Sequence, residues 1–150
     1  MRIISGTHKG RKISAPKSLP VRPTTDRAKE GLFSALSHRV NFIEVSVLDL
    51  FSGTGNLSYE FSSRGTQKID AIDAHRGACE FISKTSDLLG FSIRTTCSDV
   101  FKFIAKNTRA RNDEAPFFEL YARKYNCMNI CETKIQLERD NICTCMYVQM

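Results

Sequence analysis

The stretch with the clearest chemical meaning is VLDLFSGTGN, Val47–Asn56, where an apolar run meets an aspartate and two closely spaced glycines. A glycine turn between a buried strand and a helix is a common way for α/β proteins to bind nucleotide-like ligands. A dinucleotide fingerprint needs a third glycine, but Ser58 stands at that position. A phosphate-binding P-loop needs Gly-Lys-Ser/Thr, which the stretch lacks. The glycines alone therefore leave the ligand open.

Asp49, close to the end of the apolar run, narrows the choice of ligand. A carboxylate at this point would face the ligand, repel a pyrophosphate and attract an ammonium group. S-adenosylmethionine has an amine and a sulfonium and has no phosphate, so we expect it to be the cofactor. Taken alone, Asp49 could equally be a cap for the loop.

Two further acids, Asp73 and Asp99, follow the next two predicted strands. Asp73 comes 20 residues after Gly53, where its oxygens could accept hydrogen bonds from both hydroxyls of a ribose. Asp99 could accept one from the adenine amino group. Taken singly, Asp73 could be a turn residue and Asp99 a helix N-cap, and for Asp99 the cap is favoured. Acids at three consecutive strand ends favour a cofactor site at one edge of the sheet.

These acids need a scaffold in which strands and helices alternate. The patterns predict strand 45–50, helix 57–64, strand 68–73, helix 76–89, strand 91–97 and helix 99–106. An earlier helix, capped by Thr24 or Thr25, should end near Ser37. Its apolar stripe consists of Leu32, Phe33 and Leu36. The alternation predicts an α/β fold with a parallel sheet and right-handed crossovers.

The first third of the chain is basic. Residues 1–46 hold nine Lys and Arg against three Asp and Glu, whereas the remainder is balanced. The runs RIISG and RKISAP flank a glycine-containing turn, so we expect a β-hairpin with Lys9, Arg11 and Lys12 close to its exposed face. A local excess of cations favours a nucleic acid as partner, and a solvated basic face without a partner is the alternative.

Several segments together resemble the RsmD family of small-subunit (16S) ribosomal RNA methyltransferases. They are RIISG…KGRKI…P, LPVRPTTDRAKEGLFSAL, VLDLFSGTGNLSYEFSSRG and SDVFKFI, in unbroken order over about residues 1–106. The order RPTTDR before LFSGTG is more specific than the glycine loop alone. The resemblance implies a Rossmann-like class I S-adenosylmethionine-dependent methyltransferase fold and methyl transfer to the exocyclic N2 of one guanine.

The resemblance also implies roles for single residues. Its cofactor contacts would be Asp49, Ser52, Gly53, Gly55 and Asp73, with Asp99 toward the adenine. Its RNA-facing residues would be those of the basic hairpin, Lys9, Arg11 and Lys12, together with Arg22, Thr24, Thr25 and Arg27. The implied partner is ribosomal RNA or a precursor of the small ribosomal subunit.

The pattern changes after Asn107. Residues 107–150 hold no glycine and show no clean period of two, so we expect the sheet to end after three strands and the tail to be poorly ordered. The family orients its substrate amine with a [DN]-P-P-[FY] turn after a fourth strand. DEAPFF, Asp113–Phe118, is the nearest candidate and lacks the paired prolines. No catalytic residue is assigned, and we expect a frameshift, a truncation or a gene-model error near residue 107.

The chain thus divides into an RNA-facing part, 1–44, a cofactor-binding half, 45–106, and a tail outside the family, 107–150. The alternative function is a non-catalytic remnant that binds RNA or cofactor; a dehydrogenase is disfavoured by Ser58 and by the basic first third. The absence of a secretory signal and of a membrane-length apolar run predicts a cytoplasmic protein, expected as a monomer. Four of its six cysteines are clustered without zinc spacing, so no metal site is expected: Cys127, Cys131, Cys143 and Cys145.

Overall fold

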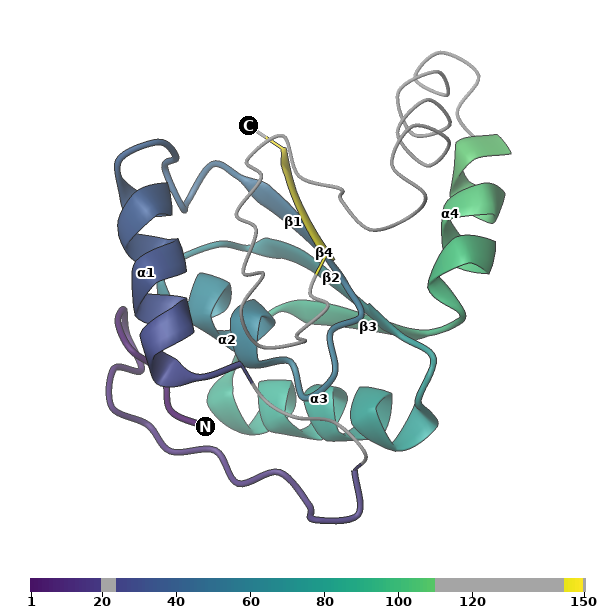
Figure 1. Cartoon of the computed structure of the whole chain (residues 1–150), viewed down its shortest axis with the longest axis horizontal. Helices are drawn as coiled ribbons and strands as arrows, with labels where there is room; N and C mark the ends of the chain where they lie inside the picture. Colours follow the sequence, from purple (N-terminus) through teal and green to yellow (C-terminus); the bar gives the residue numbers. More distant parts are fainter. Residues whose placement is uncertain (20–23, 110–144, 150) are drawn as a thin grey trace.

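The computed structural model describes residues 1–19, 24–109 and 145–149, which form an α/β fold (Figure 1). The elements, in chain order, are α1 (Asp26–Ser37), β1 (Ser46–Leu50), α2 (Asn56–Ser63), β2 (Lys68–Asp73), α3 (Arg76–Leu89), β3 (Ile93–Cys97), α4 (Val100–Arg109) and β4 (Cys145–Gln149). Three parallel strands alternate with helices, which confirms the predicted α/β class with a parallel sheet.

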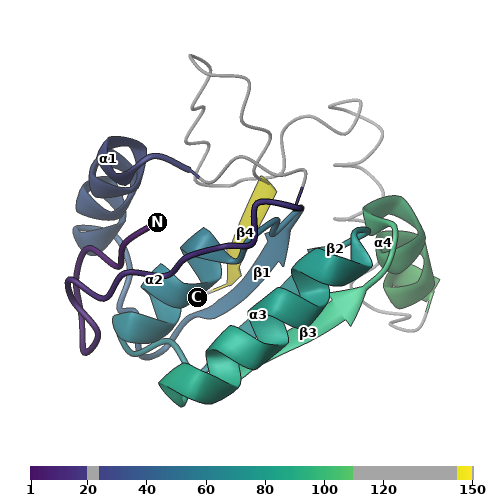
Figure 2. The same cartoon turned by 90° about the horizontal axis from the view of Figure 1, so that it is seen from below.

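The sheet has the strand order β3-β2-β1-β4. In the parallel part, Asp49 of β1 pairs with Ala71 of β2, and Asp73 at the end of β2 pairs with Cys97 of β3. The carboxyl ends of β1, β2 and β3 therefore lie along one edge, which we call the carboxyl edge. Helices α2 and α3 cover the same face of the sheet (Figure 2), as right-handed crossovers between neighbouring parallel strands require.

Strand β4 differs from the sequence-based expectation. Residues 145–149 lie in the tail, where no strand was predicted, and they pair antiparallel with β1 in the register Val47↔Val148. The sheet therefore has a fourth strand, and β1 is paired on both sides. The added strand satisfies backbone donors and acceptors that would otherwise be open along β1.

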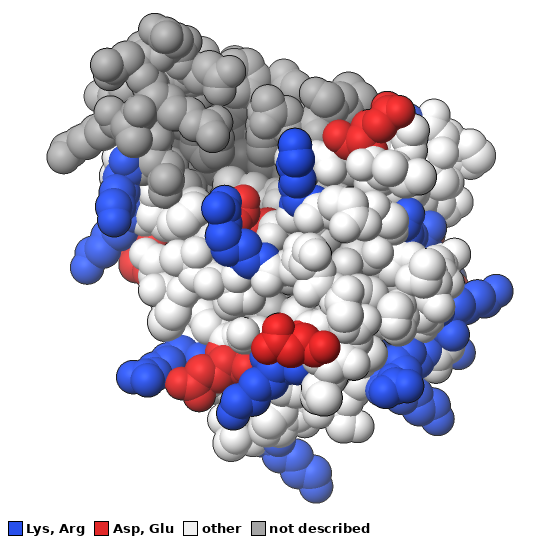
Figure 3. Space-filling model, turned by 180° about the vertical axis from the view of Figure 1, so that it is seen from behind, with Lys and Arg blue, Asp and Glu red and all other residues white. Residues whose placement is uncertain are grey.

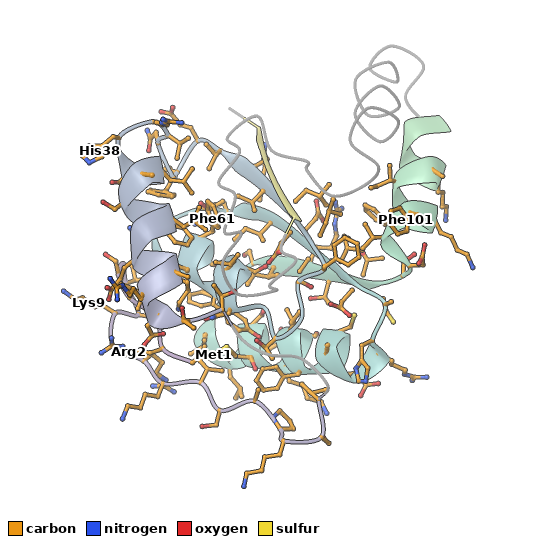
Figure 4. The ribbon with its side chains drawn as sticks, in the orientation of Figure 1. Met1, Arg2, Lys9, His38, Phe61 and Phe101 are labelled. Atoms are coloured by element: carbon orange, nitrogen blue, oxygen red, sulfur yellow. The ribbon has the colours of Figure 1, made fainter. Side chains whose placement is uncertain are left out.

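Helix α1 follows its sequence signals closely. The side chain of Thr25 caps its N-terminus by accepting from the backbone N–H of Ala28 at 3.2 Å, and Asp26 lies in the first turn. The predicted apolar stripe is buried in a core shared with β1, α2 and β2, whose members are Leu32, Phe33, Leu36, Val45, Val47, Leu57, Phe61 and Ile69. Figure 4 shows Phe61 between α1 and the sheet.

The predicted N-terminal β-hairpin is not formed as a pair of strands. The segment, residues 1–13, turns back on itself through one isolated antiparallel bridge between Arg2 and Lys12. The backbone N–H of Ile3 donates to the Arg11 carbonyl at 3.0 Å. Farther along, however, the amides of Ile4 and Ser5 donate to a side chain of α2 and not to the opposite arm. The ladder is therefore interrupted after one bridge.

Some sequence-based predictions lie outside the described residues. They are Arg22, the DEAPFF segment and three of the clustered cysteines, Cys127, Cys131 and Cys143. Cys145 begins β4. Across the described ranges, no helix combines the length and the apolar character needed to cross a membrane.

Candidate cofactor site and basic surface

The glycine loop, residues 51–55, connects β1 to α2 at the carboxyl edge. Its backbone is tied to the end of β2, because the N–H of Gly53 donates to the Asp73 carboxylate at 2.7 Å. Ser52 adds a second tie, since its N–H and its hydroxyl both donate to the Ile72 carbonyl, at 3.0 and 3.2 Å. The loop and the predicted ribose acid are therefore one hydrogen-bonded unit.

Gly55 is required by both its conformation and its surroundings. It forms the N-cap of α2 with φ +75°, in the left-handed region that side chains rarely adopt. A Cβ on Gly55 would lie 2.9 Å from Cγ1 of Ile82, which is itself fully buried. Glycine at this position lets the loop approach α3 closely while it turns into α2.

Phe51, at the start of the glycine loop, has φ 60° and is the only non-glycine residue of the described ranges with a positive φ. Such a conformation is unfavourable for a bulky side chain and often occurs at functional turns. The ring of Phe51 contacts Phe101 of α4 edge-on, with centroids 6.2 Å apart. The sharp turn after β1 is thus held partly by an aromatic contact with α4.

Asp49 lies in β1, two residues before this loop, and is 1 % exposed. Its Oδ2 accepts from the Ser58 hydroxyl at 2.5 Å, and its Oδ1 is buried with no hydrogen-bond partner among the described residues. Burial raises the pKa of Asp49 to about 7; the Ser58 hydrogen bonds oppose that rise and the charge of Asp73 adds to it. A half-satisfied buried carboxylate at this place has capacity for one more donor.

Asp73 is half-buried and more accessible than Asp49. One of its oxygens accepts from Gly53, and the other accepts from the N–H of His75 at 2.8 Å. Each carboxylate oxygen has two lone pairs, so both keep capacity to accept a further hydrogen bond. These two backbone bonds orient the carboxylate at the carboxyl edge.

Asp99 acts as the cap of α4. Its carboxylate accepts from the N–H of Lys102 at 3.0 Å, and its carbonyl accepts from the N–H of Phe103 at 2.9 Å. The structure therefore contains the helix-cap arrangement that the sequence favoured for this residue. Asp99 is exposed at the carboxyl edge, so its predicted contact with adenine stays a prediction.

The predicted RNA-facing residues fall into two groups. Lys9, Arg11 and Lys12, which we call the basic surface, are exposed and form no ion pair with any carboxylate of the described residues. In Figure 4, Lys9 lies on the side of α1 and Phe101 of α4 lies on the opposite side. Figure 3 shows basic side chains in several places over the rear face of the molecule.

Of the second group, Thr24, Thr25 and Arg27 are described, and Thr24 contacts the residue that follows the glycine loop. The carbonyl of Thr24 accepts from the Asn56 side chain at 2.7 Å, which joins the residues before α1 to the first residue of α2. Thr24 is buried, Thr25 is committed to capping α1, and Arg27 is exposed. The structure thus brings Thr24, but not Lys9, next to the predicted cofactor loop.

Sequence reasoning missed a buried ion cluster, Lys29, Glu60 and Arg64, which we call the Glu60 cluster. The side chains of Lys29 and Glu60 are 0 % exposed, and Lys29 Nζ lies 3.5 Å from Glu60 Oε2. Burial lowers the pKa of Lys29, and the charges of Glu60 and Asp26 oppose that shift. Lys29 stands three residues before Leu32 and so lies on the apolar face of α1. This spacing was a sequence signal for a buried lysine that needs an acidic partner.

The fold and the loop together define the class: an α/β protein with a parallel sheet and a glycine loop beside acids at the carboxyl edge. The family model described as conserved hypothetical protein 95 matches residues 1–145, and the chain belongs to that family. The match extends past residue 107, where the sequence pattern changes. The resemblance to the RsmD family is confirmed.

Individual relatives agree with this assignment. The chain is 33 % identical over 113 residues to the "Ribosomal RNA small subunit methyltransferase D" of Escherichia coli, covering 75 % of this chain and 56 % of that protein. The chain therefore spans just over half the length of that relative. A solved structure provisionally assigned as the methyltransferase YhhF of Escherichia coli is 30 % identical, with TM-score 0.59 over 70 % of this chain and 56 % of the other.

A second solved structure supports the fold alone. It is a hypothetical protein of Thermus thermophilus, 23 % identical, with a TM-score of 0.66 over 83 % of this chain and 78 % of the other. Because this likeness covers most of both chains, it supports the arrangement of strands and helices described above.

Proposed function

We propose that this chain derives from an S-adenosylmethionine-dependent methyltransferase that acts on the exocyclic N2 of a guanine in small-subunit ribosomal RNA. In this proposal the described fold is the Rossmann-like, class I type, and residues 45–106 are its cofactor-binding half. The observation that carries the proposal is the buried, half-satisfied carboxylate of Asp49, just before a glycine loop that is bonded to Asp73.

The residues of the carboxyl edge fit this cofactor. Asp49, when ionised, supplies negative charge and an unused acceptor for the amine, and Asp73 retains acceptor capacity for the ribose hydroxyls. The loop residues Ser52, Gly53 and Gly55 bring backbone close to the ligand, and Asp99 lies toward the adenine. Bound here, S-adenosylmethionine would supply the methyl group; the chain's own residues orient it and balance its positive charge.

Two observations support RNA as the partner: the exposed positive charges of the N-terminal part and the similarity to a ribosomal RNA methyltransferase. The basic surface offers three exposed cations for phosphates, and Arg22, Thr24, Thr25 and Arg27 belong to the same RNA-facing part, 1–44. The Escherichia coli relative is called a ribosomal RNA small subunit methyltransferase. The proposed substrate is therefore ribosomal RNA, free or in a precursor of the small subunit.

The methyl acceptor makes a further demand. The amino group of guanine is a poor nucleophile because its lone pair is shared with the ring, so it must be oriented by polar acceptors and a stacking wall. The printed sequence holds no [DN]-P-P-[FY] turn to supply them. This favours a second candidate function, a non-catalytic remnant that binds cofactor or RNA.

The missing turn leads to a proposal about the tail. We propose that the reading frame changes near residue 107, where glycine disappears from the sequence and the strand-helix rhythm ends. Translating the other two frames of the coding DNA past this codon should give an apolar strand followed by the family turn. If neither frame does so, residues 107–150 are a divergent tail of the protein itself.

Two measurements on the purified full chain test the function. Titration calorimetry with S-adenosylmethionine and with its demethylated product should give heat of binding, and no heat with either would refute the cofactor site. Transfer of tritiated methyl to immature small ribosomal subunits would establish the enzyme. Retention of RNA without label would instead establish the binding remnant.

A further inference from the structure

Glu60, in the second half of α2, is a buried carboxylate that the cofactor site does not use. It is 0 % exposed, yet its Oε2 accepts from the N–H of Ile4 at 2.8 Å and its Oε1 from the N–H of Ser5 at 3.0 Å. Arg64 adds two bonds to Oε1, at 3.0 and 3.2 Å, and Lys29 Nζ lies 3.5 Å from Oε2. Both oxygens are thus occupied by donors from three parts of the chain.

Ser63, one turn later on α2, holds the residues that follow. Its hydroxyl donates to the Ser5 carbonyl at 2.6 Å and accepts from the N–H of His8 at 3.0 Å. Its carbonyl accepts from the N–H of Thr7 at 2.7 Å. The backbone of residues 4–8 is therefore bound along the second half of one helix.

Gly6 shows how close this approach is. It has φ +85°, and a Cβ on it would lie 1.8 Å from the Ser63 carbonyl oxygen. No side chain fits in that space, so the segment rests directly on the helix backbone. The basic surface begins at Lys9, one residue after the segment that α2 holds.

We propose that Glu60 is a positioning residue for binding of RNA, holding the backbone that presents Lys9, Arg11 and Lys12 to its phosphates. This inference rests on the proposed function for its RNA partner, and it adds a residue that acts through other residues. The partner chemistry is a row of phosphates, which lysine and arginine contact without regard to base sequence.

A carboxylate suits this task and a neutral amide does not. Glu60 faces only donors: two backbone N–H groups, a guanidinium and an ammonium. A glutamine would keep the shape of the side chain, but its NH₂ group would place a donor next to donors. Its neutral charge would leave Lys29 with only the partly exposed Asp26, at 4.0 Å, as a carboxylate partner. We therefore expect Glu60→Gln to release the amides of Ile4 and Ser5 from α2, while Ser63 still holds Thr7 and His8.

The experiment measures the salt dependence of RNA affinity. Full-length protein is titrated onto fluorescein-labelled polyuridylate RNA at several KCl concentrations, and the slope of log affinity against log salt is compared between variants. Loss of three phosphate contacts should reduce the slope by about two, because each contributes about 0.7 on a single strand. Glu60→Gln should reduce the slope in the same direction as the Lys9→Ala/Arg11→Ala/Lys12→Ala variant, and by less, because Ser63 still holds Thr7 and His8. Glu80→Gln, on the exposed face of α3, should match wild type.

A second readout follows the segment itself. Amide hydrogen exchange of Ile4 and Ser5 should become faster in Glu60→Gln, while the heat of S-adenosylmethionine binding stays close to wild type. If Glu60→Gln folds poorly, Lys29→Met/Glu60→Met removes both buried charges and should show the same reduced slope. A variant that keeps its cofactor heat but loses salt dependence has lost positioning and not its fold.

The outcomes separate this inference from the proposed function. Salt-dependent binding by wild type with an unchanged slope in Glu60→Gln and in the double variant would overturn the inference and leave the RNA partner standing. Wild-type protein with no salt-dependent RNA binding would overturn both, whereas the cofactor heat would still stand. Unchanged exchange at Ile4 and Ser5 would also overturn the inference.

Discussion

Asp49 in β1 and Glu60 in α2 are both fully buried carboxylates, but they differ in the number of hydrogen-bond donors around them. Asp49 has a single side-chain donor, the Ser58 hydroxyl, and one oxygen without a partner among the described residues. Glu60 accepts from two backbone amides and pairs with two cations. One carboxylate is under-supplied with donors and the other is saturated.

The difference separates two uses of a buried charge. A saturated carboxylate fixes the groups around it, because removing any partner leaves another group unpaired. An under-supplied carboxylate is held at a cost in free energy, which a ligand carrying a donor or a positive charge can relieve. The Glu60 cluster therefore belongs to the architecture, and Asp49 belongs to the candidate site.

The largest expected effect is on stability at the saturated carboxylate. Glu60→Ala leaves the ammonium of Lys29 buried with no carboxylate closer than the partly exposed Asp26, at 4.0 Å. Breaking a buried pair in this way should lower the free energy of unfolding by about 3–5 kcal/mol. Urea unfolding of the full chain measures it, with Glu80→Ala as the exposed control, expected within about 0.5 kcal/mol of wild type. If Glu60→Ala loses no more free energy of unfolding than the control does, Glu60 is not a structural charge, and the contrast with Asp49 is wrong.

Removing the charge of Asp49 is expected to stabilise the protein, the opposite of the effect expected at Glu60. Its ordinary pKa is 3.8 and the folded value is about 7, so the folded state binds the proton more tightly and stability falls as pH rises between these values. The whole penalty is present above about pH 7 and amounts to as much as about 4 kcal/mol, at roughly 1.4 kcal/mol per pKa unit. Asp49→Asn should therefore gain stability relative to wild type as pH rises from about 4 to 8.

Urea unfolding at a series of pH values checks this sign. If the free energies of unfolding of wild type and Asp49→Asn change in parallel with pH, Asp49 does not have a raised pKa in the folded protein. The ionised form is also the one that attracts a cation. The affinity of wild type for S-adenosylmethionine should therefore rise through the same pH range, and that rise should be absent in Asp49→Asn.

A smaller effect is expected at the accessible acid of the site. Asp73→Ala should weaken binding of S-adenosylmethionine by about one to two powers of ten, because hydrogen bonds to a charged acceptor contribute about 1.5–3 kcal/mol each. Asp87→Ala is a suitable control, since Asp87 is an exposed acid on α3 away from the loop. Calorimetry measures both, and equal affinities for the two variants would remove Asp73 from the site.

The sequence located the carboxyl edge well for a physical reason. The apolar run of β1 is typical of a parallel strand inside a sheet, and the glycine loop, Asp49 and Asp73 mark the ends of β1 and β2. Local signals also sufficed for α1, where Thr25 and the apolar stripe fixed the cap and the buried face. These features depend on neighbours in sequence or on a regular period.

The features that sequence missed depend on distant partners. The predicted hairpin is present only as one isolated bridge, and beyond it the amides of Ile4 and Ser5 bond to Glu60, more than 50 residues away. Strand β4 was missed because its pairing with β1 is specified by a remote backbone, and Tyr147 and Val148 were its only β-prone signals. Long-range hydrogen bonds leave little periodic trace in the segment that makes them.

The smallest effect concerns Ser58, which stands where a dinucleotide loop would have its third glycine. Its hydroxyl is the one side-chain donor that Asp49 has among the described residues, and that bond opposes the rise of the Asp49 pKa. Ser58→Ala should therefore move the titration of Asp49 upward by about one pH unit and lower stability by about 1.5 kcal/mol, mainly above pH 7. Ser62→Ala, two turns from the loop on α2, should leave the titration in place. If both variants titrate as wild type does, the Ser58 hydrogen bond does not set the pKa of Asp49. The number of donors around each carboxylate would then not explain why Asp49 and Glu60 differ.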